Sequence, residues 1–98
     1  MDTVQQIAPG EYETTVLITN ELGLHARPAA LVAKTAQQFG AKVTLHSDSS
    51  HADAKSILDI LSLAASKGTS LVVTGKGDDA EECLKTLAGL FRVQFHEE

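Results

Sequence analysis

His25 stands directly before a segment with the apolar periodicity of a helix, within the sequence GLHARPA at residues 23–29. The first turn of a helix offers backbone N–H groups that have no partner inside the helix, together with the positive end of the helix dipole. Pro28 supplies no N–H and has a preset φ, which suits the first helical turn. The N–H groups of Ala26 and Arg27 can therefore face an anion carried by His25.

A neutral imidazole nitrogen is a nucleophile that needs no separate base, and near neutral pH much of a free histidine population is neutral. The guanidinium of Arg27 can meet the oxygens of a phosphoryl group with two parallel donors. These residue types predict a phosphoryl group held on His25. On spacing alone a plainer interpretation stays open, in which His25 only caps the helix and Arg27 is solvated.

The remaining histidines and the single cysteine give weaker signals. His46 and His51 flank a predicted hairpin turn, where a cross-strand pair could bind a metal ion. A zinc site needs three or four ligands, and no cysteine or further histidine stands nearby at a suitable spacing. We expect no metal and no cofactor, and Cys83, the only cysteine, cannot form an internal disulfide. His96 lies in a predicted tail and carries no signal.

Length and charge restrict the class of protein. A chain of 98 residues and 10.4 kDa has room for one hydrophobic core, so we expect one domain. Its formal net charge of −5 opposes binding to nucleic acid or to anionic membranes. No segment is apolar enough over about 20 residues to span a bilayer, and the first residues lack the features of a secretory signal. We expect a cytoplasmic protein and a monomer.

Hydrophobic periodicity predicts four strands and three helices. Val16 and Ile18 alternate with the positions of residues 15, 17 and 19 as in a half-buried strand, whereas Ala29, Val32 and Ala36 repeat with helical spacing. The predicted order is βαββαβα, over residues 12–19, 26–39, 42–47, a short return to residue 53, 56–66, 71–74 and 78–91. This order favours an α+β fold with helices on one face of a mainly antiparallel, four-stranded sheet. We expect residues 1–11 to be a flexible extension, 12–91 the domain and 92–98 a frayed tail.

The sequence GLHARPA resembles the active-site motif of the HPr family, the histidine-containing phosphocarrier proteins of the bacterial phosphotransferase system. Ala54-Lys55-Ser56-Ile57 before the second predicted helix, Lys67-Gly68 after it, and Gly75-Lys76-Gly77-Asp78 before the third stand at similar spacing. The resemblance covers about 80 residues and implies the open-faced sandwich of that family, which agrees with the predicted order.

The resemblance also implies a function. His25 would be phosphorylated through Nδ1 by enzyme I and would pass the group to a histidine of an enzyme IIA domain. Arg27 matches the family's active-site arginine, and Ala26 lends the backbone N–H directed at the phosphate. The chain would then be a relay in sugar uptake rather than a complete enzyme.

The second predicted helix carries more apolar residues than one core face can absorb. With Ile60, Leu63 and Ala64 facing inward, an outward patch remains on this helix and extends onto the first one. We expect this docking patch to consist of Ile57, Leu58, Leu61, Ala30 and Leu31. A wider core that buries these residues is the alternative interpretation.

Two regulatory questions stay open. Ser56 matches a serine that an HPr kinase/phosphorylase modifies in some bacteria, but a plain role as a helix cap explains the same residue. Residues 19–23 and 89–98 look similar to the nitrogen-related paralogue of HPr, and Asp59 and the net charge of −5 leave the partner undecided. A sugar-uptake carrier, a nitrogen-branch carrier and a non-catalytic regulator that binds a transcriptional regulator or a kinase are therefore all candidates.

Overall fold

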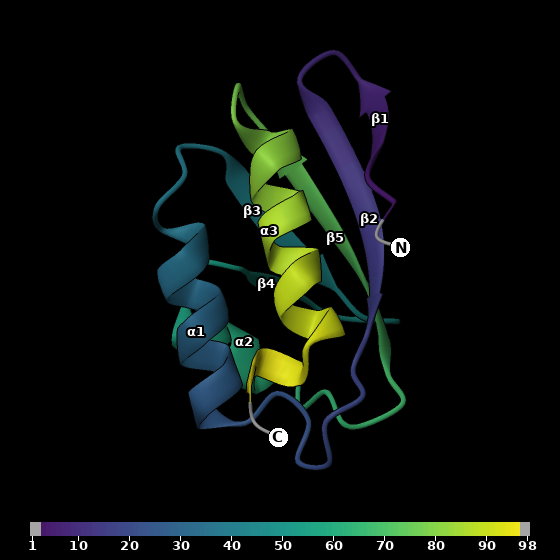
Figure 1. Cartoon of the computed structure of the whole chain (residues 1–98), viewed down its shortest axis with the longest axis vertical. Helices are drawn as coiled ribbons and strands as arrows, with labels where there is room; N and C mark the ends of the chain where they lie inside the picture. Colours follow the sequence, from purple (N-terminus) through teal and green to yellow (C-terminus); the bar gives the residue numbers. More distant parts are fainter. Residues whose placement is uncertain (1–2, 97–98) are drawn as a thin grey trace.

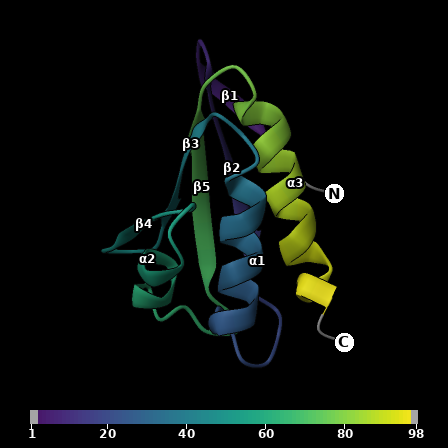
Figure 2. The same ribbon diagram turned by 90° about the vertical axis from the view of Figure 1, so that its left-hand side faces the viewer.

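The computed structural model describes residues 3–96 and consists of one antiparallel sheet covered on one face by helices (Figures 1 and 2). The strands are β1 (Gln5–Ala8), β2 (Glu11–Leu17), β3 (Lys42–His46), β4 (His51–Asp53) and β5 (Ser70–Lys76). The helices are α1 (Ala26–Ala36), α2 (Ile57–Ser62) and α3 (Ala80–Arg92), with a short 3₁₀ turn η1 (Gln94–His96) after α3. No helix within residues 3–96 is long and apolar enough to cross a membrane.

The sheet has the strand order β1-β2-β5-β3-β4, and every neighbouring pair is antiparallel. Alternate residues of the central strands, such as Val43, Leu45 and Leu71, point into the core beneath the helices and are buried. Helices α1 and α3 lie along the same face of the sheet (Figure 2). The predicted α+β class and the open-faced sandwich are confirmed.

Helix α1 forms where the periodicity predicts it, because its apolar stripe is buried against the sheet. Ala29, Val32, Ala33 and Ala36 are all fully or almost fully buried. The helix ends at Ala36, three residues before the predicted end. Residues 37–39 instead form turns that lead into β3.

Residues 5–8 differ from the expectation of a flexible extension, since they form β1 and make the sheet five-stranded rather than four-stranded. Pro9-Gly10 is the hairpin turn that joins β1 to β2, and Gly10 has the positive φ of +72° that such a turn requires. Residues 1–2 lie outside the described part of the chain.

The structure also differs from the expectation of a frayed tail over residues 92–98. Helix α3 continues to Arg92, and Phe95 is buried with its ring against Phe91, at a centroid distance of 4.9 Å. Phe95 continues the apolar stripe of α3, which explains why the chain folds back there. Residues 97–98 of the predicted tail lie outside the described residues.

Helix α2 ends at Ser62, four residues before the predicted end at Ser66. Ala64 has a left-handed φ of +51°, which stops the helix and directs Ala65 toward the loop before α1. Ala64 is exposed, whereas the expectation placed it inward, and Ile60 is the fully buried residue of α2.

The candidate phosphoryl-carrier site

His25 occupies the N-cap position of α1, and its side chain makes no capping hydrogen bond to the first turn. Its backbone is extended, and its carbonyl accepts a hydrogen bond from the N–H of Ala29 at 3.0 Å. The backbone of His25 thus begins the helix while the imidazole is not used as a cap. The interpretation of His25 as a simple helix cap has no support in this geometry.

The N-terminus of α1 differs from those of the other two α-helices in residues 3–96. Helix α2 is capped by Ser56 and has Asp59 in its first turn, and α3 has Glu81 and Glu82 there. Helix α1 has neither a side-chain cap nor an acidic residue in its first turn. Its positive end is not neutralised by the helix's own side chains, so it remains suited to an external anion.

Arg27 is exposed in the same first turn, and Ala26 beside it is exposed as well. A cation at the N-terminus of a helix opposes the helix dipole and costs stability of about 0.3–1 kcal/mol. An anion bound beside His25 would turn this cost into an attraction. Pro28 is buried beneath them and anchors the turn to the core.

The loop that carries His25 is fastened to the segment after α2. The N–H of Leu24 donates to the carbonyl of Ala65 at 3.0 Å, and Leu24 is buried. Gly23 has a φ of +68°, and a Cβ added there would stand 2.5 Å from the carbonyl oxygen of Ala65. Only glycine fits this contact, because its backbone lies directly against that of residues 65–66.

Two polar contacts support the same loop. Asn20 is buried and donates from its side-chain amide to the carbonyl of Gly23 at 2.7 Å. Lys67 and Glu21 form an exposed ion pair at 2.7 Å. The hydrogen bond with Lys67, and then its charge, lowers the pKa of the Glu21 carboxyl, and the same contact raises the pKa of Lys67.

Helices α1 and α2 are joined at the other end of α1. The side-chain amide of Gln37 donates to the carbonyl of Lys55 at 2.9 Å, and the ammonium of Lys55 donates to the carbonyl of Phe39 at 2.7 Å. Together with the Leu24–Ala65 contact, these bonds fix α2 relative to His25 at both ends of α1.

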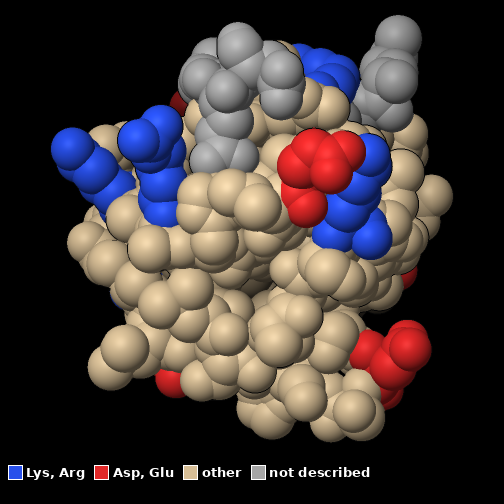
Figure 3. Space-filling model, turned by 90° about the horizontal axis from the view of Figure 1, so that it is seen from below, with Lys and Arg blue, Asp and Glu red and all other residues tan. Residues whose placement is uncertain are grey.

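The predicted docking patch is exposed on α2. Leu58 is 76% exposed, Ile57 41% and Leu61 36%, whereas Ala30 and Leu31 on α1 are half-buried. Sequence reasoning missed Leu22, which is 74% exposed and lies three residues before His25. The signal available in the sequence was a large apolar residue in a turn, where a side chain is commonly exposed. Figure 3 shows the end of the molecule that holds this loop, a largely uncharged surface with Lys and Arg along its upper side and acidic groups on its right side.

Ser56 is the N-cap of α2, as predicted from its position. Its hydroxyl oxygen accepts a hydrogen bond from the N–H of Asp59 at 3.2 Å. The carboxylate of Asp59 in turn accepts from the N–H of Asp53 at 3.2 Å. The Ser56 hydroxyl thus has a structural role beside two carboxylates of this turn.

The other chemically active residue types form no comparable site. His46 and His51 are paired across β3 and β4 with ring centroids 6.3 Å apart, and His46 Nε2 lies 2.9 Å from the hydroxyl of Thr74. Within residues 3–96, no three His, Cys, Asp or Glu side chains gather as a metal site would require. Burial, and secondarily Asp79, raises the pKa of the Cys83 thiol to about 11, which keeps it protonated.

Comparison with known proteins agrees with this arrangement. The family described as "PTS HPr component phosphorylation site" matches residues 12–92. The chain belongs to the HPr family. The chain is 38% identical over 84 residues to phosphocarrier protein HPr of Treponema pallidum. This alignment covers 86% of the chain and 96% of the relative.

It is also 40% identical over 85 residues to phosphocarrier protein NPr of Escherichia coli K12, which covers 86% of the chain and 94% of the relative. The crystal structure of HPr from Thermoanaerobacter tengcongensis superposes with a TM-score of 0.84 at 43% identity, over 88% of the chain and 97% of that structure. The chain is thus an HPr/NPr-type phosphocarrier of the phosphotransferase system.

Proposed function

We propose that His25 accepts a phosphoryl group on Nδ1 from phosphorylated enzyme I and donates it to a histidine of an enzyme IIA domain in sugar uptake. The observation that carries the proposal is the N-terminus of α1 at His25, which has neither a side-chain cap nor an acidic residue in its first turn. The domain that does this comprises residues 12–91, and it is a phosphoryl relay in the cytoplasm rather than a complete enzyme.

In each transfer one N–P bond forms and one breaks. The Nδ1 lone pair of His25 attacks phosphorus, and the electron pair of the broken bond returns to the imidazole nitrogen of the donor. The amides of Ala26 and Arg27 and the guanidinium of Arg27 hold the phosphoryl oxygens during this exchange. Because the group must leave as readily as it arrives, positioning contributes more than tight binding.

The test uses purified enzyme I and phosphoenolpyruvate. We expect the chain to gain one phosphate that is labile in acid and stable in alkali, and to lose it when a matching enzyme IIA domain is added. Mass spectrometry of the intact protein measures both steps. A chain that stays unlabelled with active enzyme I contradicts the proposal and favours a non-catalytic regulator that acts through the docking patch.

A nitrogen-branch carrier is the second candidate, since the NPr of Escherichia coli K12 is as similar to this chain as the HPr relatives are. The labelled protein separates the two when it is offered a sugar-type and a nitrogen-type enzyme IIA domain in parallel. Faster loss of the label to the sugar-type domain supports our proposal. Faster loss to the nitrogen-type domain replaces it with the second candidate.

Arg27→Ala is expected to slow phosphoryl transfer about 10- to 100-fold, because a charge-assisted hydrogen bond contributes roughly 1.5–3 kcal/mol. Folding stability should not fall, since Arg27 is exposed and opposes the dipole of α1. Transfer rates and thermal unfolding check the two effects separately. Lys34→Ala, an exposed cation at the other end of α1, is the matched control. An unchanged rate would show that Arg27 is merely solvated.

Ser56→Asp is expected to weaken binding to enzyme I while leaving stability within about 0.5 kcal/mol. Aspartate caps a helix as well as serine does, and the helix dipole offsets the repulsion from Asp59. The new charge stands directly before the exposed Ile57 and Leu58, where a docking partner must desolvate it. Ser49→Asp adds the same charge in the turn between β3 and β4 as a control.

Titration calorimetry on the folded variants gives the affinities. Equal affinity of the wild type and Ser56→Asp would remove α2 from the docking surface. Weaker binding by the Ser56 variant alone would support it, and would fit phosphorylation of Ser56 by an HPr kinase/phosphorylase as a means of regulation.

A further inference from the structure

Strand β1 lies before the segment that the HPr family matches, which begins at residue 12. It runs antiparallel to β2 and covers the outer edge of the sheet (Figure 1). The strand is therefore an addition to the family's domain, and its position suggests that it acts on the edge of β2.

Hydrogen bonds just beyond β2 show which of its backbone groups face that edge. The N–H of Ile18 donates to the carbonyl of Thr69 at 2.9 Å, and the carbonyl of Ile18 accepts from the N–H of Gly68 at 2.7 Å. Backbone groups in a strand alternate between its two sides. The backbone N–H and C=O groups of the even-numbered residues of β2 thus point toward β5. Those of the odd-numbered residues point to the outer edge of the sheet: Glu11, Glu13, Thr15 and Leu17.

Strand β1 closes part of this edge. Ala8 is paired with Glu11 and Gln5 with Glu13, and the hydroxyl of Thr14 donates to the carbonyl of Thr3 at 2.7 Å. Without β1, the seven residues of β2 would form a long unpaired edge, which is a template for adding another strand. The other edge of the sheet, β4, has only three residues, and Asp59 already accepts from the N–H of Asp53 there.

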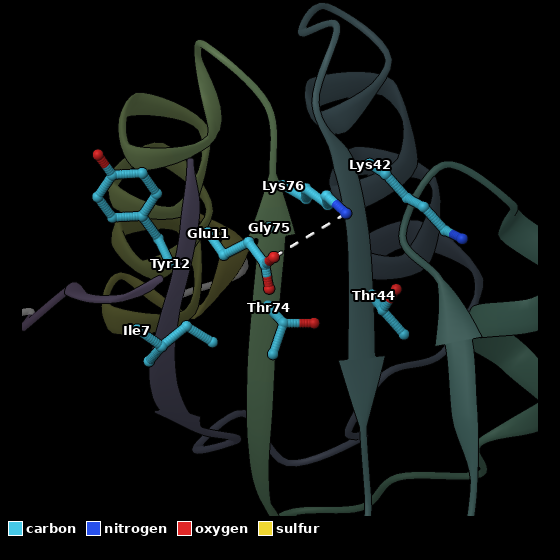
Figure 4. A pocket seen from close by; sticks show the side chains of 8 residues that line it. All are labelled: Ile7, Glu11, Tyr12, Lys42, Thr44, Thr74, Gly75 and Lys76. Carbon is cyan, nitrogen blue, oxygen red and sulfur yellow. Dashed lines mark ion pairs between the residues drawn. The ribbon is translucent and has the colours of Figure 1, made fainter. Parts of the chain in front are cut away.

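Few side chains hold β1 in place. Three of its four residues are exposed, Ile7 is 50% exposed, and the pairing is irregular between Gln6 and Ala8. In Figure 4, Ile7 stands at the side of a shallow hollow of about 180 Å³ on the open face, near the Glu11–Lys76 ion pair. A strand held mainly by backbone pairing, with few buried side chains of its own, opens at low free-energy cost.

We propose that the outer edge of β2 is a self-association interface for a second copy of this chain, and that β1 closes it within the monomer. Two β2 strands paired antiparallel around a two-fold axis at Thr14 would use all seven residues of each strand. Glu13 would face Thr15 of the second copy, and Glu11 would face Leu17. No like charges then stand directly opposite each other across the new pair. The unpaired backbone groups of one edge would hydrogen-bond to those of the same edge on the second copy.

The test opens β1 in the full-length chain with Gln5→Pro combined with Ala8→Pro. Both residues lie opposite outward-facing residues of β2, so each substitution removes a donor to β2. Gln6→Pro is the matched control, because Gln6 lies opposite Tyr12 and its N–H points away from β2. We expect sedimentation velocity to give twice the monomer mass for the opened variant at rising concentration. The wild type and Gln6→Pro should stay at 10.4 kDa.

Adding Thr15→Pro to the opened variant locates the interface, since it removes an outward N–H of β2 without removing a bond to β5. We expect this triple variant to return to the monomer mass. An opened variant that stays monomeric, a wild type that dimerises, or a triple variant that remains dimeric would each overturn the proposal. Labelling of His25 in dilute opened variant should match the wild type, so failure here is distinguishable from failure of the phosphocarrier proposal.

Discussion

His25→Ala is expected to incorporate no phosphate from enzyme I and phosphoenolpyruvate, because the variant loses the imidazole at the N-terminus of α1. The protein should remain folded, with a change in stability of about 1 kcal/mol or less. The imidazole makes no capping bond, and the backbone that begins the helix is unaffected. The readout is the intact mass after incubation, together with the unfolding temperature.

His51→Ala is the matched control for this experiment. His51 is exposed on β4, with its ring tilted at 36° to that of His46 on the neighbouring strand, and it does not precede a helix as His25 does. It should be labelled at the wild-type rate. Phosphate that persists on His25→Ala, or disappears from His51→Ala, would assign the carrier nitrogen to another residue.

The parts of the fold that the sequence predicts are those with a buried, periodic face. The stripe of Ala29, Val32 and Ala36 defines α1, and Val16 and Ile18 define the inward side of β2 and the loop after it. In each case the residues that contact the core are apolar, so the periodicity can be recognised from neighbouring residues in the sequence. The N-cap role of Ser56 was predictable for the same reason, since capping depends on neighbours within three residues.

Strand β1 escaped prediction because it has almost no buried face. Its residues Gln5 to Ala8 are held by backbone pairing, which leaves no hydrophobic alternation in the sequence. The dipeptide Pro9-Gly10 was the signal, since it is a typical turn pair directly before a strand. Phe95 was a similar signal, four residues after the buried Phe91.

The candidate site was predictable in its residues but not in its supports. The motif at residues 23–29 points to His25 and Arg27, whereas the contact between Gly23 and Ala65 joins residues 42 positions apart. Likewise, the end of α2 at Ser62 depends on where Ala65 must lie to meet Leu24. The sequence shows the glycine that such a long-range contact requires, but it does not show which distant residue packs against that glycine.

Gly23→Ala is expected to destabilise the fold by roughly 2–5 kcal/mol. A left-handed backbone costs a non-glycine residue about 1–2 kcal/mol, and forcing a methyl group into a packed site costs about 1–3 kcal/mol more. The added Cβ would meet the backbone of Ala65 and Ser66, at 2.5 and 2.8 Å, and backbone atoms cannot rotate away as a side chain can. Denaturant unfolding measures the change in the free energy of unfolding.

Gly10→Ala separates these two costs, because Gly10 has nearly the same φ, +72° against +68°, and a Cβ there would meet nothing within 4 Å. It should lose only the conformational part, about 1–2 kcal/mol. Below its unfolding temperature, Gly23→Ala should also accept phosphate more slowly than Gly10→Ala, because relief of the clash displaces Leu24 and with it His25. Equal stability and equal labelling of the two variants would mean that the contact with Ala65 does not position the carrier histidine.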